Sequence, residues 1–322
     1  MPIPPDWSKG LRKFVEGWLE APKNEPLSDD YLGDAPFDKF VLTESVSSWN
    51  EFLKWVNQLQ GSWCFRGQRD AHWNLDTSLD LAVKRDFDGG YDHLERKPEL
   101  HELLFLFRQQ AHQYIADLPS SDDLGSWFAL MQHHGAPTGF LDWTKSPYVA
   151  LYFAFEEEPP EEGCALWAID LGWLEQKARE LLSKDTNGPV TAPATSAWDD
   201  FERRANYVNG FLRQTKTHVI LQVNPLRLNP RMVAQQGFFL CKLYDQATFS
   251  QILMSMMTHP EKSDGPDIPD HPVVRKLVLQ KELRIRFLKH LRAMNIHRAS
   301  LFPGLDGLGK SLRLDLEMKI KS

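Results

Sequence analysis

One stretch, residues 132–155 (QHHGAPTGFLDWTKSPYVALYFAF), constrains the fold of this chain more than any other. A turn at residues 135–137 is followed by a short apolar run, residues 140–143, that contains one acidic residue. Residues 144–147 then carry a helix-start signal, with Ser146 as the expected N-cap and Pro147 in the first turn, and an apolar helix follows it. This order predicts a loop–strand–loop–helix unit with its polar groups at the two joints, where protein scaffolds usually carry their functional sites.

The composition is that of an ordinary globular protein. The chain has 322 residues, of which 42% are hydrophobic and 25% are charged. The formal net charge of −7 gives no overall basic field that would attract nucleic acid or an anionic membrane, although a local basic face stays open. The first residues do not form a signal peptide, and no uncharged apolar run approaches the roughly 18 residues of a membrane span. We therefore expect a cytoplasmic protein with no membrane partner.

The cysteine pattern points away from metal binding. Cys64, Cys164 and Cys241 lie far apart, each in a strand-like apolar run, which predicts buried, reduced thiols. Their spacing does not match a zinc site, and no His-Glu-x-x-His motif occurs. The sequence therefore predicts no metal site.

Helix and strand signals alternate irregularly along the chain. Helices are expected at residues 45–59, 99–115, 171–182, 246–257 and 282–294, with a last amphipathic helix through Leu308, Leu312 and Leu316. Strands are expected at residues 63–68, 140–143, 164–169, 218–223 and 273–279, and residues 231–243 resemble two short strands around a bend. Ser47 or Ser48, and Asp122 or Asp123, are the expected N-caps of two helices. Because regular βαβ repetition is absent, the pattern favours an α+β fold.

The chain shows no internal repeat and no clear linker, so we expect a single domain over residues 41–322. Residues 1–40 are rich in proline and are interpreted as an N-terminal arm, with a short helix at residues 7–19.

Three groups of residues resemble the bacterial FRG domain, which is named for a Phe-Arg-Gly motif. The first is Phe65-Arg66-Gly67, and the second runs through residues 132–154 (QHHGAPT, LDWT, SP, AL and FA). The third joins Arg231 and Gln235-x-Gly237-x-Phe239 to the tail segment LFPGLDG. The resemblance covers residues 48–314, with one departure, since Gly139 stands where the family usually has a basic residue.

The same motif order is similar, more distantly, to that of arginine-type ADP-ribosyltransferases. This resemblance implies a mixed, split β-sheet of that type flanked by helices, with NAD as the substrate. It also implies release of nicotinamide and transfer of ADP-ribose to a macromolecule or to water, as in a bacterial toxin or an anti-phage effector. Gln235 and Gly237 depart from the pattern, because they stand where the transferases have their catalytic glutamates.

Arg66 is the first candidate for a ligand contact. At the end of a strand, its guanidinium can hold a pyrophosphate bidentately, and Gly67 lets the backbone approach a ligand closely. The alternative is a structural salt bridge between Arg66 and Asp70, Asp76 or Asp142.

Asp142 lies in an apolar run, so its carboxylate needs a partner. It orients either Arg66 or a ring nitrogen of His133, or it accepts backbone N–H groups from the turn after Thr144. His133 is a candidate hydrogen-bond donor to a ribose or a candidate acid/base, although one of the two adjacent histidines is expected only to interact with the helix dipole.

The remaining candidates follow from the transferase resemblance. Gln235 would contact a ribose hydroxyl, and Glu102 would replace the missing acid, unless it is an ordinary solvated helix residue. Trp143 or Phe239 would stack on nicotinamide or adenine. The other expected wall residues of the cleft are Phe65, Thr138, Thr144 and Gly237. Two alternatives stay open: a non-enzymatic module that binds a nucleotide or nucleic acid in the same cleft, and an interaction scaffold.

Overall fold

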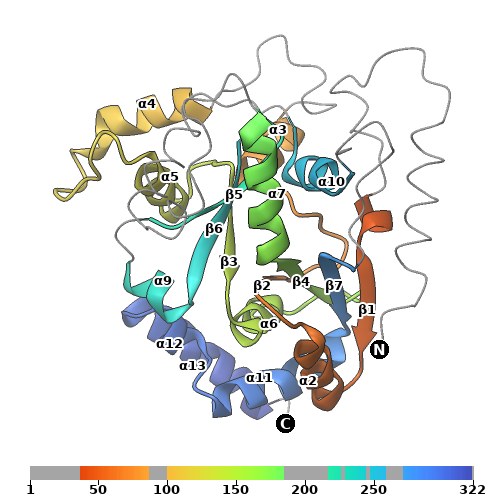
Figure 1. The fold of residues 1–322 in the computed structure, drawn as a ribbon. Coiled ribbons are helices and arrows are strands. Elements are labelled where there is room, and N and C mark those ends of the chain that lie inside the picture. The colour runs from red at the N-terminus through yellow and green to blue at the C-terminus, as the bar shows by residue number, and fades with distance from the viewer. Residues whose placement is uncertain are drawn as a thin grey trace.

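The computed structural model describes residues 37–86, 100–184, 217–225, 229–243, 247–258 and 271–320. The expected helix at residues 7–19 and nearly all of the expected arm therefore lie outside the described residues. Within them, a single central β-sheet is covered by helices (Figure 1). None of the helices in this part of the chain combines the length and the hydropathy that crossing a membrane requires.

Seven strands form the sheet, in the order β1-β7-β4-β2-β3-β6-β5. They are β1 (Leu42–Val46), β2 (Trp63–Gln68), β3 (Phe140–Thr144), β4 (Cys164–Asp170), β5 (Ile220–Val223), β6 (Gly237–Lys242) and β7 (Val274–Leu279). Strands β1 and β7 are parallel, and all other neighbours are antiparallel. The mixed sheet confirms the expected α+β class.

The sheet is nearly divided between β2 and β3. These strands pair at one position only, Phe65 opposite Thr144. By contrast, β2 pairs with β4 at six positions and β3 pairs with β6 at five. The sheet thus consists of two halves, β1-β7-β4-β2 and β3-β6-β5, which meet at a single point.

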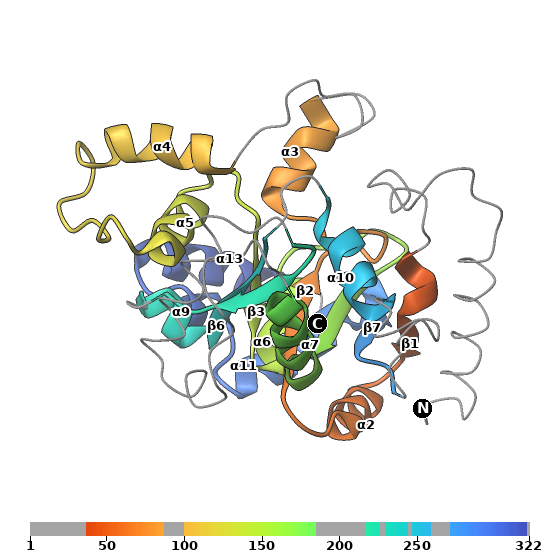
Figure 2. The ribbon, with the colours of Figure 1, turned by 45° about the horizontal axis from the view of Figure 1, so that its top comes forward.

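Helices cover both faces of this sheet. They are α2 (Trp49–Gln58), α3 (Ser78–Asp86), α4 (Leu100–Ala111), α5 (Leu124–His133), α6 (Pro147–Phe155), α7 (Leu171–Lys184), α9 (Pro230–Ala234), α10 (Phe249–Thr258), α11 (Arg284–Ala293), α12 (Arg298–Leu301) and α13 (Leu305–Ile320), with short 3₁₀ turns η2 (Phe37–Phe40) and η5 (Lys281–Leu283). Helix α6 packs on β2, β3 and β4, with α11 against it, while α7 packs on β2, β4 and β5. Figures 1 and 2 show α7 and α6 on opposite sides of the sheet.

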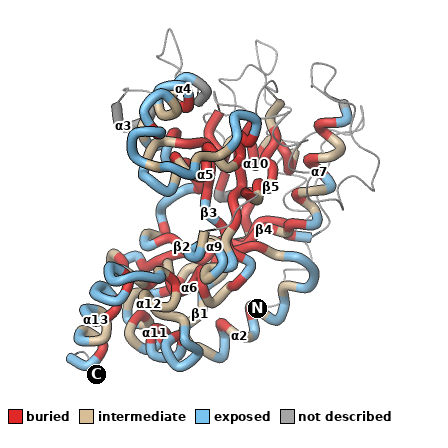
Figure 3. Tube along the Cα trace, turned by 90° about the vertical axis from the view of Figure 1, so that its left-hand side faces the viewer, coloured by how far each residue is buried: buried red, intermediate tan, exposed pale blue. Residues whose placement is uncertain are grey.

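Strand β4 explains why the protein has two hydrophobic cores. Ala165, Trp167 and Ile169 belong to the core beneath α7 and α10, whereas Leu166 and Ala168 belong to the core around α6. Successive side chains of a strand point to opposite faces, so a central strand covered by helices on both sides is apolar throughout. Figure 3 shows the buried residues concentrated along this central layer.

Helix α6 lies deep in the second core because it is apolar on every side. Six of its nine residues are buried. Ser146 caps it by accepting a hydrogen bond from the Val149 N–H, and Pro147 occupies its first turn. This cap is confirmed, as are Ser48 for α2 and Asp123 for α5.

Residues 231–243 do not form two strands, and that prediction is wrong. The structure has the short helix α9 followed by β6. Asn229 caps α9 by accepting from the Met232 N–H, and Pro230 opens its first turn. These two start signals lie immediately before the segment in which strands were expected. Strand β1 was also missed, because its alternating partly buried and exposed residues give no continuous apolar run.

Helix α13 has its expected apolar stripe, but that stripe does not face the core. Leu308, Leu312 and Leu316 are exposed, whereas Gly307, Ser311 and Met318 are buried. A Cβ atom at Gly307 would lie 1.8 Å from the Phe302 carbonyl oxygen, so the start of the helix can pack there only through a glycine. The leucine spacing therefore located the helix without showing which of its faces is buried.

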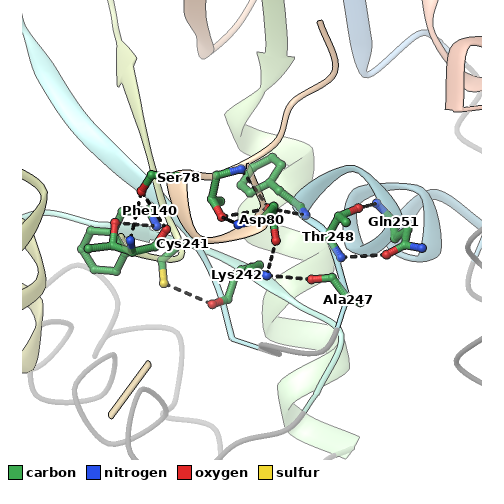
Figure 4. A network of polar contacts seen from close by, with 11 residues as sticks. Ser78, Asp80, Phe140, Cys241, Lys242, Ala247, Thr248 and Gln251 are labelled. Carbon is green, nitrogen blue, oxygen red and sulfur yellow. Dashed lines mark hydrogen bonds and ion pairs between the residues drawn. The ribbon is translucent and has the colours of Figure 1, made fainter. Parts of the chain in front are cut away.

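A fully buried ion pair fixes α3 against the far end of β6. The Lys242 ammonium lies 2.5 Å from Asp80 Oδ1, and both side chains are 0% exposed. Lys242 also donates to the Ala247 carbonyl, and the second oxygen of Asp80 accepts from Thr77 and from the Phe249 N–H. Figure 4 shows how these contacts join α3, β6 and the start of α10.

We expect Lys242→Met to lower the free energy of unfolding by about 3–5 kcal/mol, because the Asp80 carboxylate then stays buried without its counter-charge. Chemical denaturation followed by fluorescence measures this change. The exposed Lys310→Met variant is the control and should shift stability by less than about 0.5 kcal/mol. Equal effects of the two variants would contradict the structural role of the pair.

Candidate functional site

A cavity of about 410 Å³ opens where β2 and β3 stop pairing. Its walls come from the end of β2 and the following loop, from β3, α6 and α9, and from the start of β6. The lining residues are Phe65, Arg66, Gly67, Gln68, Arg69, Trp73, Asp142, Trp143, Thr144, Ala150, Phe153, Glu156, Glu157, Arg231, Met232, Gln235, Gly237, Phe238 and Phe239. The structure thus brings together most of the residues that the sequence singled out.

Arg66 bridges the gap between the two strands. Its Nη1 donates to the backbone carbonyl of Asp142 at 2.7 Å. Its Nε is buried and has no hydrogen-bond partner in the described part of the protein. Burial lowers the pKa of Arg66, while the nearby Asp142 charge raises it. Arg66 therefore forms a backbone contact in place of the alternative salt bridge, and its buried Nε–H is left without a partner in the described residues.

The Asp142 carboxylate is held by a residue to which the sequence analysis gave no role. Gln132 donates from Nε2 to Asp142 Oδ2 at 3.1 Å, and its Oε1 accepts from the hydroxyl of Thr138. Thr138 is fully buried and lies outside the cavity lining, so it supports Gln132 and does not line the cavity. Asp142 itself is exposed, although it lies in an apolar run of the sequence.

His133 ends α5 near the cavity without lining it. Partial burial lowers its pKa, and the neighbouring charges of His134 and Arg231 lower it further, whereas Asp142 raises it. The lowered pKa favours a neutral imidazole at neutral pH. His133 thus interacts electrostatically with Arg231 and Asp142, two residues that do line the cavity.

Thr144 and Gln235 hold two walls of the cavity together. The Thr144 hydroxyl donates to the Gln235 carbonyl at 2.7 Å and accepts from the Ser146 N–H at 3.0 Å. The Gln235 side chain donates from Nε2 to the Leu301 carbonyl at 3.0 Å. This bond occupies one amide hydrogen and leaves the amide oxygen of Gln235 as the group that can accept from a ribose hydroxyl.

Gly67 has a structural role that the sequence interpretation did not foresee. A Cβ atom there would lie 1.9 Å from the Ala150 carbonyl oxygen and 2.6 Å from the Ala154 nitrogen, both in α6. The glycine lets α6 lie directly on β2. Close packing of a helix is thus sufficient to explain a glycine at this position.

Three carboxylates line the cavity, and Glu102 is not among them. Glu102 lies exposed on α4. Besides Asp142, the cavity has Glu156, which forms an ion pair with Arg298, and Glu157, which lies 3.2 Å from Arg69. Both glutamates lie in an acidic run after α6 that has no periodic pattern, so the sequence analysis singled out neither of them.

Arg231 and Trp73 are two further lining residues that sequence reasoning did not assign. Arg231 is exposed, and its guanidinium carbon lies 4.3 Å from the centroid of the Phe302 ring. Trp73 is 47% exposed, whereas the expected stacking residues Trp143 and Phe239 are 2% and 5% exposed. Two signals in the sequence could have identified these residues. Arg231 belongs to the family motifs, and Trp73 is an isolated tryptophan in a polar loop.

The geometry defines an α+β protein with a charged cavity at the junction of two half-sheets. Residues 61–163 match the model of the FRG domain, so the chain carries an FRG domain and the recognised family is confirmed. The match contains Arg66, Asp142 and the whole of α6, but it ends before α9 and β6. Searches among curated proteins and among solved structures gave no match.

We expect Gly67→Ala to destabilise the fold by about 1–3 kcal/mol, because the added methyl group overpacks the contact between β2 and α6. Gly309→Ala in α13 is the matched control, since nothing lies within 4 Å of the position that its Cβ atom would take. Removing a glycine from a helix should raise stability there by up to about 1 kcal/mol. Thermal and chemical denaturation measure both changes, and a harmless Gly67→Ala would refute the packing role.

Proposed function

We propose that this protein binds NAD in the cavity between the two half-sheets and releases nicotinamide, passing ADP-ribose to a macromolecule or to water. The proposal rests on one observation at Arg66. This residue lines the cavity, and its buried Nε has no partner in the described residues. A buried donor without a partner is costly, and a small rotation of the Arg66 side chain toward a phosphate oxygen of the ligand would satisfy it.

Three arginines of the cavity lining can contact an anionic ligand, although three carboxylates line the cavity as well. Arg69 and Arg231 line it together with Arg66. A guanidinium can hold two oxygens of one phosphate group at once, which suits the pyrophosphate of a dinucleotide. The cavity volume of about 410 Å³ also lies within the range of small-molecule sites, roughly 300–1,000 Å³.

The nearly divided sheet supports the finer assignment to the ADP-ribosyltransferase type. The transferase resemblance implies a split sheet and a cleft that binds NAD. Here the two halves meet at one residue pair, and the cavity lies beside that pair.

The reaction needs a carboxylate near the ribose. When the bond between nicotinamide and C1′ breaks, the bonding electrons leave with neutral nicotinamide and positive charge develops on the ribose. Gln235 carries no charge, and Glu102 lies outside the cavity. Asp142, held by Gln132, is the carboxylate that we assign to this charge.

The acceptor completes the reaction by attacking C1′ through an oxygen or nitrogen and losing a proton. His133 lies beside the cavity without lining it, and it is our candidate for receiving that proton because its lowered pKa keeps the imidazole neutral. It is close enough to interact electrostatically with Asp142.

A second function, binding of a nucleotide or of nucleic acid without reaction, is favoured by one observation. At the position where the transferases carry a catalytic glutamate, the chain has Gln235, and the amide nitrogen of this residue is bonded to the Leu301 carbonyl. A neutral side chain tied to the backbone suits positioning better than catalysis. Binding of NAD without release of nicotinamide would identify this second function.

We expect Arg66→Gln to weaken NAD binding by about 1.5–3 kcal/mol, on the order of ten- to a hundredfold in Kd, because a charged hydrogen bond to phosphate is lost. Isothermal titration calorimetry measures the effect. Arg313→Gln, which alters an exposed arginine of α13, is the control and should leave the Kd unchanged. If the unaltered protein neither binds NAD nor releases nicotinamide, the proposal fails.

We expect Asp142→Asn to lower the rate of nicotinamide release on the order of a hundredfold while the Kd for NAD changes little, because asparagine keeps an oxygen for Gln132 but loses the charge. Chromatographic detection of nicotinamide gives the rate. Asp306→Asn on the exposed side of α13 is the matched control. If Asp142→Asn releases nicotinamide at the rate of the unaltered protein, another residue must stabilise the positive charge on the ribose.

A further inference from the structure

The loop after β2 holds an exposed tryptophan in a fixed place at the cavity. Trp73 is 47% exposed and lines the cavity. Its loop is bonded to the sheet region on both sides, since the Ala71 N–H donates to the Gly163 carbonyl at 3.0 Å and Gln68 donates to the Asn74 carbonyl at 2.9 Å. Such anchoring positions the indole before any ligand arrives.

The anchoring reaches the centre of the sheet. Gln68 is buried, and its amide oxygen accepts from the indole N–H of Trp167 in β4 at 2.6 Å. Because Trp167 is fully buried, Gln68 has little freedom to move. The position of the Trp73 loop therefore depends on contacts at the buried centre of the sheet.

A cation covers one face of the Trp73 ring. The guanidinium carbon of Arg69 lies 5.6 Å from the ring centroid. Arg69 is itself held by Glu157, whose Oε2 lies 3.2 Å from its Nη1. All three residues line the same cavity, and within the described residues the indole N–H of Trp73 makes no hydrogen bond. The exposed part of the ring and the N–H are left for a ligand.

The other aromatic side chains of the cavity cannot serve in this way. Phe65, Phe238, Phe239 and Trp143 are 4%, 2%, 5% and 2% exposed, so their ring faces already pack against protein. Phe153 is only partly exposed, and its ring packs edge-on against Phe302. Trp73 is thus the most exposed aromatic side chain in the cavity lining.

We propose that Trp73 and Arg69 form a ring-binding subsite of the cavity, which stacks the planar ring of a nucleotide while Arg66 holds a phosphate. This inference rests on the proposed function, which gives the class of ligand. It adds the two side chains that would bind the ring of that ligand. Stacking on an indole tolerates different bases, since each has a π-face. Arg69 on the opposite face strengthens the stack through its charge.

The test compares ligands that differ only in the ring. Isothermal titration calorimetry on the full chain gives the Kd of AMP and of ribose 5-phosphate for the unaltered protein and for Trp73→Leu and Trp73→Phe. We expect the unaltered protein to bind AMP about tenfold more tightly than ribose 5-phosphate. Trp73→Leu should remove this preference without changing the Kd of ribose 5-phosphate, and Trp73→Phe should keep most of it.

A control variant separates ring stacking from a general effect of losing an exposed aromatic side chain. Phe105 is 60% exposed on α4 and does not line the cavity, so Phe105→Leu should leave both Kd values unchanged. Melting temperatures of all variants show whether each one folds. If Trp73→Leu is unfolded, the comparison of Trp73→Phe with Trp73→His, which keeps a smaller ring, takes its place, and the preference for AMP should fall with ring size.

The inference is overturned if the unaltered protein prefers AMP no more than ribose 5-phosphate, if it binds neither, or if Trp73→Leu keeps the preference. If a folded Trp73→Leu protein loses affinity for AMP and for ribose 5-phosphate by the same factor, the inference is also overturned, since that outcome assigns the residue a structural role. Nicotinamide release is measured separately. A Trp73-dependent preference for AMP without nicotinamide release would support the subsite while refuting the proposed enzyme activity.

Discussion

The bond between Arg66 and the Asp142 carbonyl is the contact on which the site depends. Strands β2 and β3 pair at Phe65 and Thr144, and beyond that point no ladder bond joins them. The arginine side chain spans the gap at 2.7 Å, so it holds the two half-sheets together where the backbone cannot. The same guanidinium keeps a buried N–H without a partner. The Arg66 side chain therefore joins the two half-sheets and also brings a positive charge to the cavity. The stability of the junction is thus linked to the binding proposed there.

Packing contacts and hydrogen bonds between elements that are distant in sequence hold the walls of the cavity in place. Gly67 lets α6 lie on β2, and this contact places Ala150 and Phe153 in the lining. Gln132 holds the Asp142 carboxylate from the end of α5. Thr144 bonds to the Gln235 carbonyl and so joins β3 to the segment before β6. These supports come from elements that are distant in sequence, which explains why motif order alone described the site only in outline.

Local signals were sufficient for much of the fold. The caps Ser48, Asp123 and Ser146 were predictable because an N-cap side chain bonds to backbone only three residues away. The strands β2, β4 and β7 were recognisable as short apolar runs. Prediction failed for β1, whose alternation gives little contrast, and for α9, whose start signals preceded the segment considered. At the site, Arg66, Asp142 and Gln235 were found from motifs, whereas Trp73, Glu156 and Glu157 lie in loops without periodicity.

The sequence by itself determined the α+β class, the FRG domain and the identity of the charged residues at the strand ends, because these depend on neighbouring residues and on motif order. Only the tertiary structure decided that β2 and β3 part after one pair, that Gln132 is the partner of Asp142, and that Glu102 lies outside the cavity. The reason is physical. Strand pairing and side-chain partners are chosen by contacts between segments far apart in the chain, and a linear pattern carries no information about which distant surfaces will meet.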